Sequence, residues 1–199
     1  ETEVLTATEF VLPNLTAVIT GVGNGRVTDA RDLDGYSVLW HVPIDDTHHW
    51  KYDFDFRRSG PIQGVRRTEM VNYQAIRNLS NRYQQDRKEM VNDTYSGFGR
   101  DFTVHDKWAT EGEAPIQDRT TEHLGAPDRA IATARELLLK AIRDLQEGKE
   151  PANVIRDPDL NDLPLAPWVM HAPKGTDWEA YCGYVEGLAR SDGYWNSHS

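Results

Sequence analysis

Residues 50–56 alternate strictly between aromatic and charged side chains, and this pattern constrains the local fold more than any other feature of the sequence. The aromatics are Trp50, Tyr52, Phe54 and Phe56, and the charged residues between them are Lys51, Asp53 and Asp55. Successive side chains of a β-strand point to opposite faces, so a strand here has one aromatic and one charged face. The alternation therefore predicts a half-buried strand of an antiparallel sheet.

Three further strand-like segments precede this one, and a long helical pattern follows it. Segments 4–12, 16–20 and 36–42 have the composition of strands. Over residues 128–147 the apolar residues recur at spacings of three, four and seven, and Gly148 can end a helix there. Strands followed by a helix, without alternation, predict an α+β fold in which an antiparallel sheet embraces the helix. We expect one domain, with residues 1–150 forming its body and residues 151–199 forming an irregular tail that packs on the domain or on a neighbouring subunit.

The net charge excludes some classes of partner. The chain carries 22 Lys and Arg against 32 Asp and Glu, a formal net charge of −10, which repels nucleic acid and anionic lipid. The apolar runs are shorter than the roughly 20 residues that cross a bilayer. With one cysteine the chain has no internal disulfide, which favours a reducing compartment. We expect a cytoplasmic protein that binds neither nucleic acid nor membrane.

Arginines are spread through a region that is short of apolar residues. They are Arg57, Arg58, Arg66, Arg67, Arg77, Arg82 and Arg87. Such a region is typical of a long surface excursion with some helix. A solvated face and a docking surface for an acidic partner or an anionic substrate both remain open.

The adjacent pair His48-His49 follows Asp45 and Asp46 and has the composition of a metal cluster. Adjacent residues on a strand point to opposite faces, so only one of the two histidines can face a given pocket. A turn that Asp45 and Asp46 cap is the other interpretation. None of the histidines has a standard zinc or iron spacing within this chain.

A second candidate is the pair His105-Asp106. By composition alone Asp106 is a solvated charge or a helix cap in a mixed loop. Glu111 and Glu113 suggest a glycosidase-like carboxylate pair, but only their separation in space can decide that. Cys182 lies between aromatic residues, as packing cysteines often do. The chain has no phosphate-binding glycine loop ending in Lys-Ser or Lys-Thr and no Gly-x-Ser-x-Gly nucleophile elbow.

Three segments, in order along the chain, resemble parts of one enzyme family. They are residues 41–48, 82–87 and 111–131, and the third contains Pro115-Ile116-Gln117-Asp118-Arg119 followed by Glu122-His123-Leu124-Gly125. They resemble the phthalate-dioxygenase-like branch of the Rieske non-haem iron oxygenases. In that branch a Pro-Ile-x-Asp-Arg-x-x-Glu-His-Leu-Gly segment leads into the last long helix.

The resemblance implies a helix-grip fold and a mononuclear Fe(II) held by two histidines and one carboxylate. The family's carboxylate follows a glutamine a few residues before the Glu-x-x-x-Pro-Ile segment. Asp106 stands at that position and is implied to be the catalytic iron ligand, although His105 replaces the glutamine. The family's electrons come from a Rieske 2Fe-2S cluster, supplied in turn by a reductase or ferredoxin, and its subunits form trimers or hexamers. The implied reaction uses O2 to hydroxylate or O-demethylate an aromatic substrate, a step of aromatic catabolism.

The aromatic face of the predicted sheet is a candidate substrate pocket. Its members are Trp40, Val42, Trp50, Tyr52 and Phe54, and Trp108 near Asp106 is a further candidate. These side chains could line an apolar pocket for a flat ring. The alternative is that they are ordinary core residues.

The family's cluster ligands and its Asp-x-x-His-x-x-x-x-His motif, which carries both iron histidines, are not found in these residues. We therefore expect the chain to be a fragment or one part of a split protein. Two rivals remain: a non-catalytic helix-grip module that binds a ligand or partner subunit, and the small β subunit of ring-hydroxylating dioxygenases. The second should lack the Asp-Arg-x-x-Glu-His-Leu-Gly run, so the sequence disfavours it.

Overall fold

The computed structural model describes residues 2–19, 35–57, 70–161, 163, 165 and 167–189. Three arginines of the predicted surface excursion, Arg58, Arg66 and Arg67, lie outside these ranges. The chain divides into two compact units. Unit 1 comprises Glu1–Ile62 with His123–Ser199, and unit 2 comprises Gln63–Glu122.

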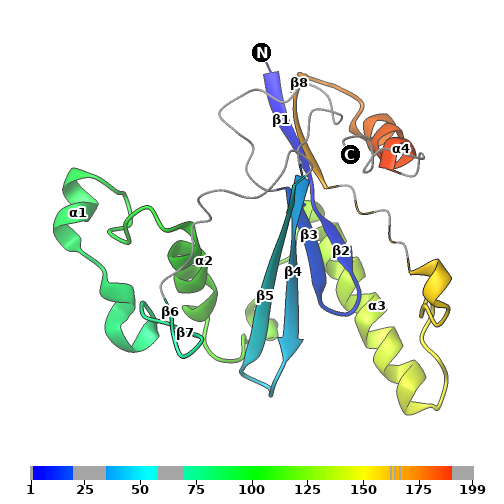
Figure 1. The fold of residues 1–199 in the computed structure, drawn as a ribbon, viewed down its shortest axis with the longest axis horizontal. Coiled ribbons are helices and arrows are strands. Elements are labelled where there is room, and N and C mark those ends of the chain that lie inside the picture. The colour runs from blue at the N-terminus through cyan, green and yellow to red at the C-terminus, as the bar shows by residue number, and fades with distance from the viewer. Residues whose placement is uncertain are drawn as a thin grey trace. The chain divides into compact units, whose positions relative to one another are not determined.

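Unit 1 contains a four-stranded antiparallel sheet (Figure 1). Its strands, in spatial order, are β2 (Glu9–Val11), β3 (Leu15–Ile19), β4 (Gly35–Pro43) and β5 (His49–Arg57). The turn at Pro13-Asn14 separates β2 from β3, as its sequence predicts. The alternating segment forms β5 and pairs with β4 along its whole length, with Val38 opposite Phe54 and Trp40 opposite Tyr52. The predicted strand at 4–12 is divided at Thr8 into two strands that belong to different sheets.

The first of these, β1 (Thr2–Ala7), pairs with β8 (Trp168–Pro173) from the other end of the chain. The helix α4 (Trp178–Ala189) follows β8, and the Tyr181 ring lies 4.9 Å from the Trp168 ring in an edge-to-face contact. Trp168 and Val169 are among the few buried apolar residues. Part of the tail that we expected to be irregular is therefore a strand and a helix within unit 1.

The long helix α3 spans Arg129–Gln146, close to the predicted 128–147. It follows two short helical turns, η3 (Arg119–Thr121) and η4 (Ala126–Asp128), and η5 (Pro158–Leu160) comes after it. At its end Gly148 has a φ of +71°, a conformation that glycine adopts at little cost. None of the side chains of α3 is fully buried; Ile131, Ile142 and Leu145 are between 43% and 63% exposed. The α+β class is confirmed, and the helix-grip arrangement stays a prediction.

Unit 2 has its own small core. Its described elements are the hairpin β6 (Met70–Val71) and β7 (Gln74–Ala75), η2 (Leu79–Gln84), α1 (Arg87–Asn92) and α2 (Phe102–Glu111). Tyr83, Phe98 and Val104 are buried together, each exposing 2% or less of its surface. The segment around Arg77 and Arg82, which we expected to be a surface excursion, therefore contributes to a packed unit. Within the described parts of the chain, no helix is both long and apolar enough to span a bilayer.

Candidate functional site

Asp106 lies in the middle of α2 and not in a loop. The helix begins where the Asp101 carboxylate accepts a hydrogen bond from the Thr103 amide at 3.1 Å, a standard N-cap. It ends at Gly112, whose amide donates to the Trp108 carbonyl at 3.0 Å. Composition alone had left Asp106 as a loop or cap residue, because α2 has only a weak apolar stripe. The N-cap at Asp101 and the packing of one face of α2 stabilise this segment as a helix.

The inner face of α2 packs on an aromatic cluster. Val104 is 1% exposed, and the ring of Phe98 lies 5.7 Å from that of His105 and 5.5 Å from that of Trp108. Tyr83 contacts the other side of Phe98 edge-on, with ring centroids 6.0 Å apart. Aromatic contacts of this kind hold the helix at a fixed position in unit 2.

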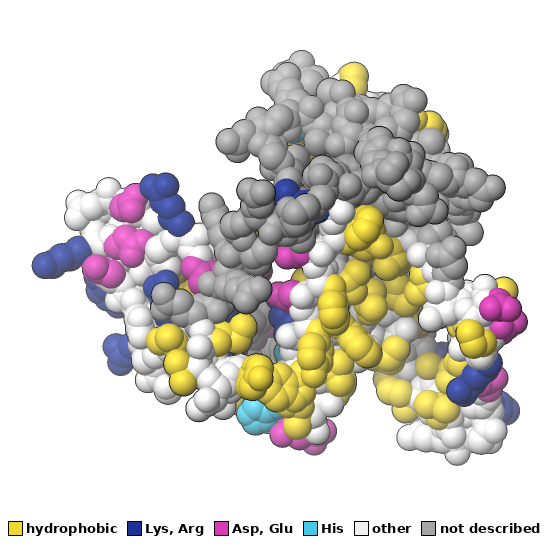
Figure 2. Space-filling model, in the orientation of Figure 1, with side chains coloured by type: hydrophobic (Ala, Val, Ile, Leu, Met, Phe, Trp, Pro, Cys, Tyr) yellow, Lys and Arg dark blue, Asp and Glu magenta, His cyan; other side chains and the backbone are white. Residues whose placement is uncertain are grey.

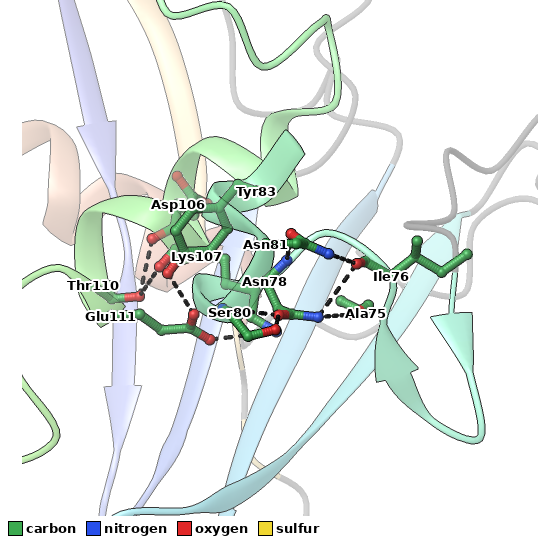
Figure 3. A network of polar contacts seen from close by, with 10 residues as sticks. All are labelled: Ala75, Ile76, Asn78, Ser80, Asn81, Tyr83, Asp106, Lys107, Thr110 and Glu111. Carbon is green, nitrogen blue, oxygen red and sulfur yellow. Dashed lines mark hydrogen bonds and ion pairs between the residues drawn. The ribbon is translucent and has the colours of Figure 1, made fainter. Parts of the chain in front are cut away.

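Polar contacts fix the C-terminal end of α2 (Figure 3). The Tyr83 hydroxyl donates to Glu111 at 2.6 Å, and Lys107 forms an ion pair with the other Glu111 oxygen at 3.3 Å. Burial, and then the neighbouring Glu111, raise the pKa of Tyr83, so the phenol stays protonated and remains a donor. Both carboxylate oxygens of Glu111 therefore have partners, Tyr83 and Lys107. These contacts explain the position of Glu111 without the glycosidase-like carboxylate pair.

The turn that carries Tyr83 is itself tightly held. Arg77 donates to the carbonyl of Tyr83 at 2.9 Å and to that of Phe98 at 2.6 Å. Asn78 caps the turn, accepting from the Ser80 amide and donating to the carbonyls of Ala75 and Ile76 (Figure 3). Tyr83 has a φ of +55°, which costs energy in a bulky residue and persists only where surrounding contacts impose it.

Glu89 on α1 holds the loop that precedes α2. Glu89 accepts hydrogen bonds from the Gly99 amide at 2.7 Å and from the Thr94 hydroxyl. Gly97 has a φ of +71°, and a Cβ atom there would lie 2.4 Å from the Asp86 carbonyl oxygen, so only glycine fits. Sequence reasoning missed Glu89, Tyr83 and Arg77 as supports of the site. Gly97 and Gly99 on either side of Phe98 were the available signal of a close backbone approach.

His105 faces this loop. Its Nε2 atom donates to the Gly99 carbonyl at 3.0 Å and lies 3.5 Å from the Ser96 hydroxyl. Together with the ring contact to Phe98, these bonds give His105 a role in holding α2 against the loop. The Nε2 atom of His105 thus already has a hydrogen-bond partner in the loop.

Asp106 points away from this core. Two helical residues correspond to a rotation of about 200°, which places Asp106 opposite the buried Val104. Asp106 is exposed, and Phe102, one turn earlier on the same face, is 71% exposed. Among the described residues, no hydrogen bond or ion pair to the Asp106 carboxylate is present. The carboxylate therefore has both oxygens available for a ligand.

The Asp118-Arg119 motif after α2 makes a local structure. Asp118 accepts hydrogen bonds from the Thr120 amide and hydroxyl, at 2.9 and 2.6 Å, and these bonds lower the pKa of its carboxyl group. Arg119 pairs with Glu122 one turn later. The motif thus builds the capped turn η3 that leads the chain out of unit 2.

The two adjacent histidines at the start of β5, His48 and His49, contact different partners. His48 bonds to Asp45 at 2.9 Å, and Asp45 also accepts from the Thr47 amide at 2.8 Å. These contacts lower the pKa of Asp45 to about 2, the Thr47 amide having the largest effect. The turn is therefore capped by Asp45, as one of the two interpretations expected. His49 instead faces His41, with Nε2 3.0 Å from Nδ1.

The described residues do not form a complete metal site. Nowhere in the described ranges do three His, Cys, Asp or Glu side chains gather closely enough to hold an ion. The single exposed carboxylate of Asp106 fits one ligand position of an iron site that has two histidines and a carboxylate. The assignment of Asp106 as an iron ligand stays a prediction, and the described residues do not bring two histidines to its carboxylate.

The predicted pocket aromatics share one face of the sheet and are not buried. Trp40, Trp50, Tyr52 and Phe54 are between 43% and 54% exposed. Figure 2 shows hydrophobic side chains gathered over these strands. Trp40 contacts Tyr52 across the strands, with ring centroids 6.1 Å apart, and Val42 is partly buried. Trp108, the remaining candidate, is half exposed and belongs to unit 2.

Comparison of the sequence with known proteins identifies the family of the chain. The family described as LigXa C-terminal domain like matches residues 36–193. The chain belongs to this family.

Three curated proteins are similar to the chain. The phthalate 4,5-dioxygenase oxygenase subunit of Pseudomonas putida is 34% identical over 125 residues, covering 55% of this chain and 27% of that protein. The 3-chlorobenzoate-3,4-dioxygenase oxygenase subunit of Comamonas testosteroni is 27% identical over 175 residues, covering 75% and 40%. The 5,5'-dehydrodivanillate O-demethylase oxygenase subunit of Sphingobium sp. (strain NBRC 103272 / SYK-6) is 38% identical over 55 residues, covering 27% and 13%.

These relatives confirm the resemblance to the catalytic domain of Rieske oxygenases of the phthalate-dioxygenase-like branch. All three are named as oxygenase subunits. The chain spans less than half the length of each of them.

Proposed function

We propose that the chain forms the C-terminal part of the catalytic domain of a Rieske-type oxygenase that hydroxylates or O-demethylates an aromatic acid. The observation that carries the proposal is Asp106, an exposed carboxylate on the outer face of a rigidly held helix, nine residues before Pro115 and its Ile-Gln-Asp-Arg continuation. The relatives named for phthalate, 3-chlorobenzoate and 5,5'-dehydrodivanillate support an aromatic carboxylate as the substrate class.

A mononuclear Fe(II), when bound, would supply dioxygen activation, and a Rieske 2Fe-2S cluster outside these residues would supply the electrons. Asp106 would hold the iron through its carboxylate and contribute the negative charge that partly balances the ion. Tyr83, Glu111 and the Phe98 cluster would act through α2, keeping that carboxylate at one position. The two histidine ligands would come from outside the described residues.

The substrate would lie against aromatic side chains. The sheet face that carries Trp40, Trp50 and Tyr52 offers half-exposed rings on which a flat aromatic ring can stack. Val42 belongs to the same sheet face, and Trp108 is a separate candidate on α2 in unit 2. A reductase or ferredoxin would deliver electrons to the cluster, and a trimeric or hexameric assembly is part of the proposal by analogy with the family.

The test is iron binding by Asp106→Asn in the full-length protein. The substitution keeps the size of the side chain and removes its charge, so we expect mononuclear iron to fall about tenfold or more while the cluster iron remains. Elemental analysis together with the electron paramagnetic resonance of the reduced cluster separates the two. Glu113→Gln is the matched control, because it removes an exposed carboxylate just beyond the same helix. Full retention of mononuclear iron in Asp106→Asn would show that Asp106 is not a ligand, whereas absence of mononuclear iron from the native protein would favour the non-catalytic helix-grip module.

A further inference from the structure

A pair of histidines lies on the charged face of the sheet, away from the aromatics. His41 on β4 pairs with Lys51 on β5, and His49 pairs with Pro43. His41 and His49 are therefore diagonal neighbours on one face. Their ring centroids lie 5.0 Å apart, and Nδ1 of His41 lies 3.0 Å from Nε2 of His49.

That separation suits a shared metal ion. Two histidine nitrogens that bind one ion at about 2.0–2.1 Å lie roughly 2.9–3.4 Å apart, between cis-octahedral and tetrahedral geometry. In the absence of an ion, one nitrogen donates a hydrogen bond to the other. An ion would replace the shared proton, with little movement of either ring.

Asn14 holds the backbone of one of the two histidines in place. The His41 amide donates to the Asn14 carbonyl at 3.0 Å, and the Asn14 side chain donates to the His41 carbonyl at 2.6 Å. His41 is thus fixed through both of its backbone polar groups, and a preorganised ligand loses less entropy on binding.

The surrounding charges and ligand types restrict the ion. Lys51 opposes a cation, and Asp53, 3.5 Å from its ammonium group, offsets part of that charge. Imidazole nitrogens favour copper, nickel and zinc over calcium and magnesium, and copper(II) over zinc(II). His48 makes a separate contact, with its Nδ1 atom bonded to Asp45 and Thr47.

We propose that His41 and His49 form a two-histidine site for one late first-row divalent ion, copper(II) or zinc(II), which links β4 to β5. The site does not use Asp106, and it does not depend on the proposed oxygenase function. Its remaining coordination positions are open to water or to an external ligand.

The test is calorimetric titration of the chain with zinc chloride near pH 7.5. We expect one zinc ion per chain, with affinity lowered about tenfold or more by His41→Gln or His49→Gln, because each removes one of two ligands. His48→Gln is the matched control and should bind zinc as the native chain does. Asp106→Asn should also bind zinc as the native chain does. A negative result for zinc therefore says nothing about iron binding, and a negative result for iron says nothing about zinc binding. Unchanged zinc binding in both histidine variants, or no binding by the native chain, overturns the proposal.

Copper(II) titration supplies a readout that needs no variant. The electron paramagnetic resonance spectrum of the native chain with one equivalent of copper(II) should show coupling to two imidazole nitrogens. Coupling to fewer than two contradicts the site, whatever the folding of the variants.

Discussion

The aromatic face of β5 and the aromatic core of unit 2 use similar residues in opposite ways. On β5 the rings of Tyr52 and Phe54 stack, with centroids 6.4 Å apart, yet each is about half exposed. In unit 2 the rings of Tyr83 and Phe98 are each 2% exposed. The aromatic face of β5 can therefore contact a ligand or another surface. The aromatic core of unit 2 instead packs against α2 and holds the helix that carries Asp106. The alternating pattern of a strand predicts which face each side chain is on. Only the burial of a side chain in the structure shows whether it stabilises the fold.

The largest expected difference between the regions comes from removing one ring in each. Phe98→Ala should destabilise unit 2 by about 3–5 kcal/mol, since it leaves a cavity against Tyr83 and Val104. Phe54→Ala should cost about 1 kcal/mol, because its ring is already half solvated and contributes mainly cross-strand contacts. Hydrogen exchange resolved by residue measures the two units separately. Equal losses would mean that the β5 face is covered as tightly as the unit 2 core.

A smaller effect is expected from removing one hydroxyl in each region. Tyr83→Phe should cost about 1–3 kcal/mol, since it takes away the donor to Glu111 in a buried setting and leaves Lys107 as the partner of that carboxylate. Tyr52→Phe changes an exposed ring and should alter stability by less than about 0.5 kcal/mol. Chemical denaturation of both variants provides the comparison. A Tyr83→Phe chain as stable as Tyr52→Phe would show that the aromatic contacts alone hold α2.

The smallest effect concerns the turn that joins β4 and β5. The pKa of Asp45 is lowered from 3.8 to about 2 by the Thr47 amide and then by His48. A carboxyl group with a lowered pKa stabilises the folded turn above its ordinary pKa, and this stabilisation is lost as the pH falls through about 2. Nuclear magnetic resonance titration should show the Thr47 amide shifting with that midpoint, and His48→Ala should raise it. A midpoint near 3.8 would mean that the cap does not form in solution.

Much of the fold could be predicted from local patterns. The alternation at 50–56 predicted β5, and the apolar spacing with Gly148 predicted α3 to within a residue or two. These predictions succeed because period and capping are properties of neighbouring residues. The pairing of β1 with β8 could not be predicted, since it joins residues about 165 positions apart and depends on the closure of the whole unit.

The candidate site shows the same division. The sequence by itself determined which residue to examine, because its resemblance to the oxygenase family points to Asp106, a few residues before the Pro-Ile-Gln-Asp-Arg run. Only the tertiary structure decided that Asp106 lies on a helix, on the face opposite Val104, while Tyr83 and Arg77 hold that helix from a distant turn. The physical reason is that a residue's type and spacing are local, whereas exposure, the direction of a side chain and the nearness of His41 to His49 arise only when separate segments pack or pair.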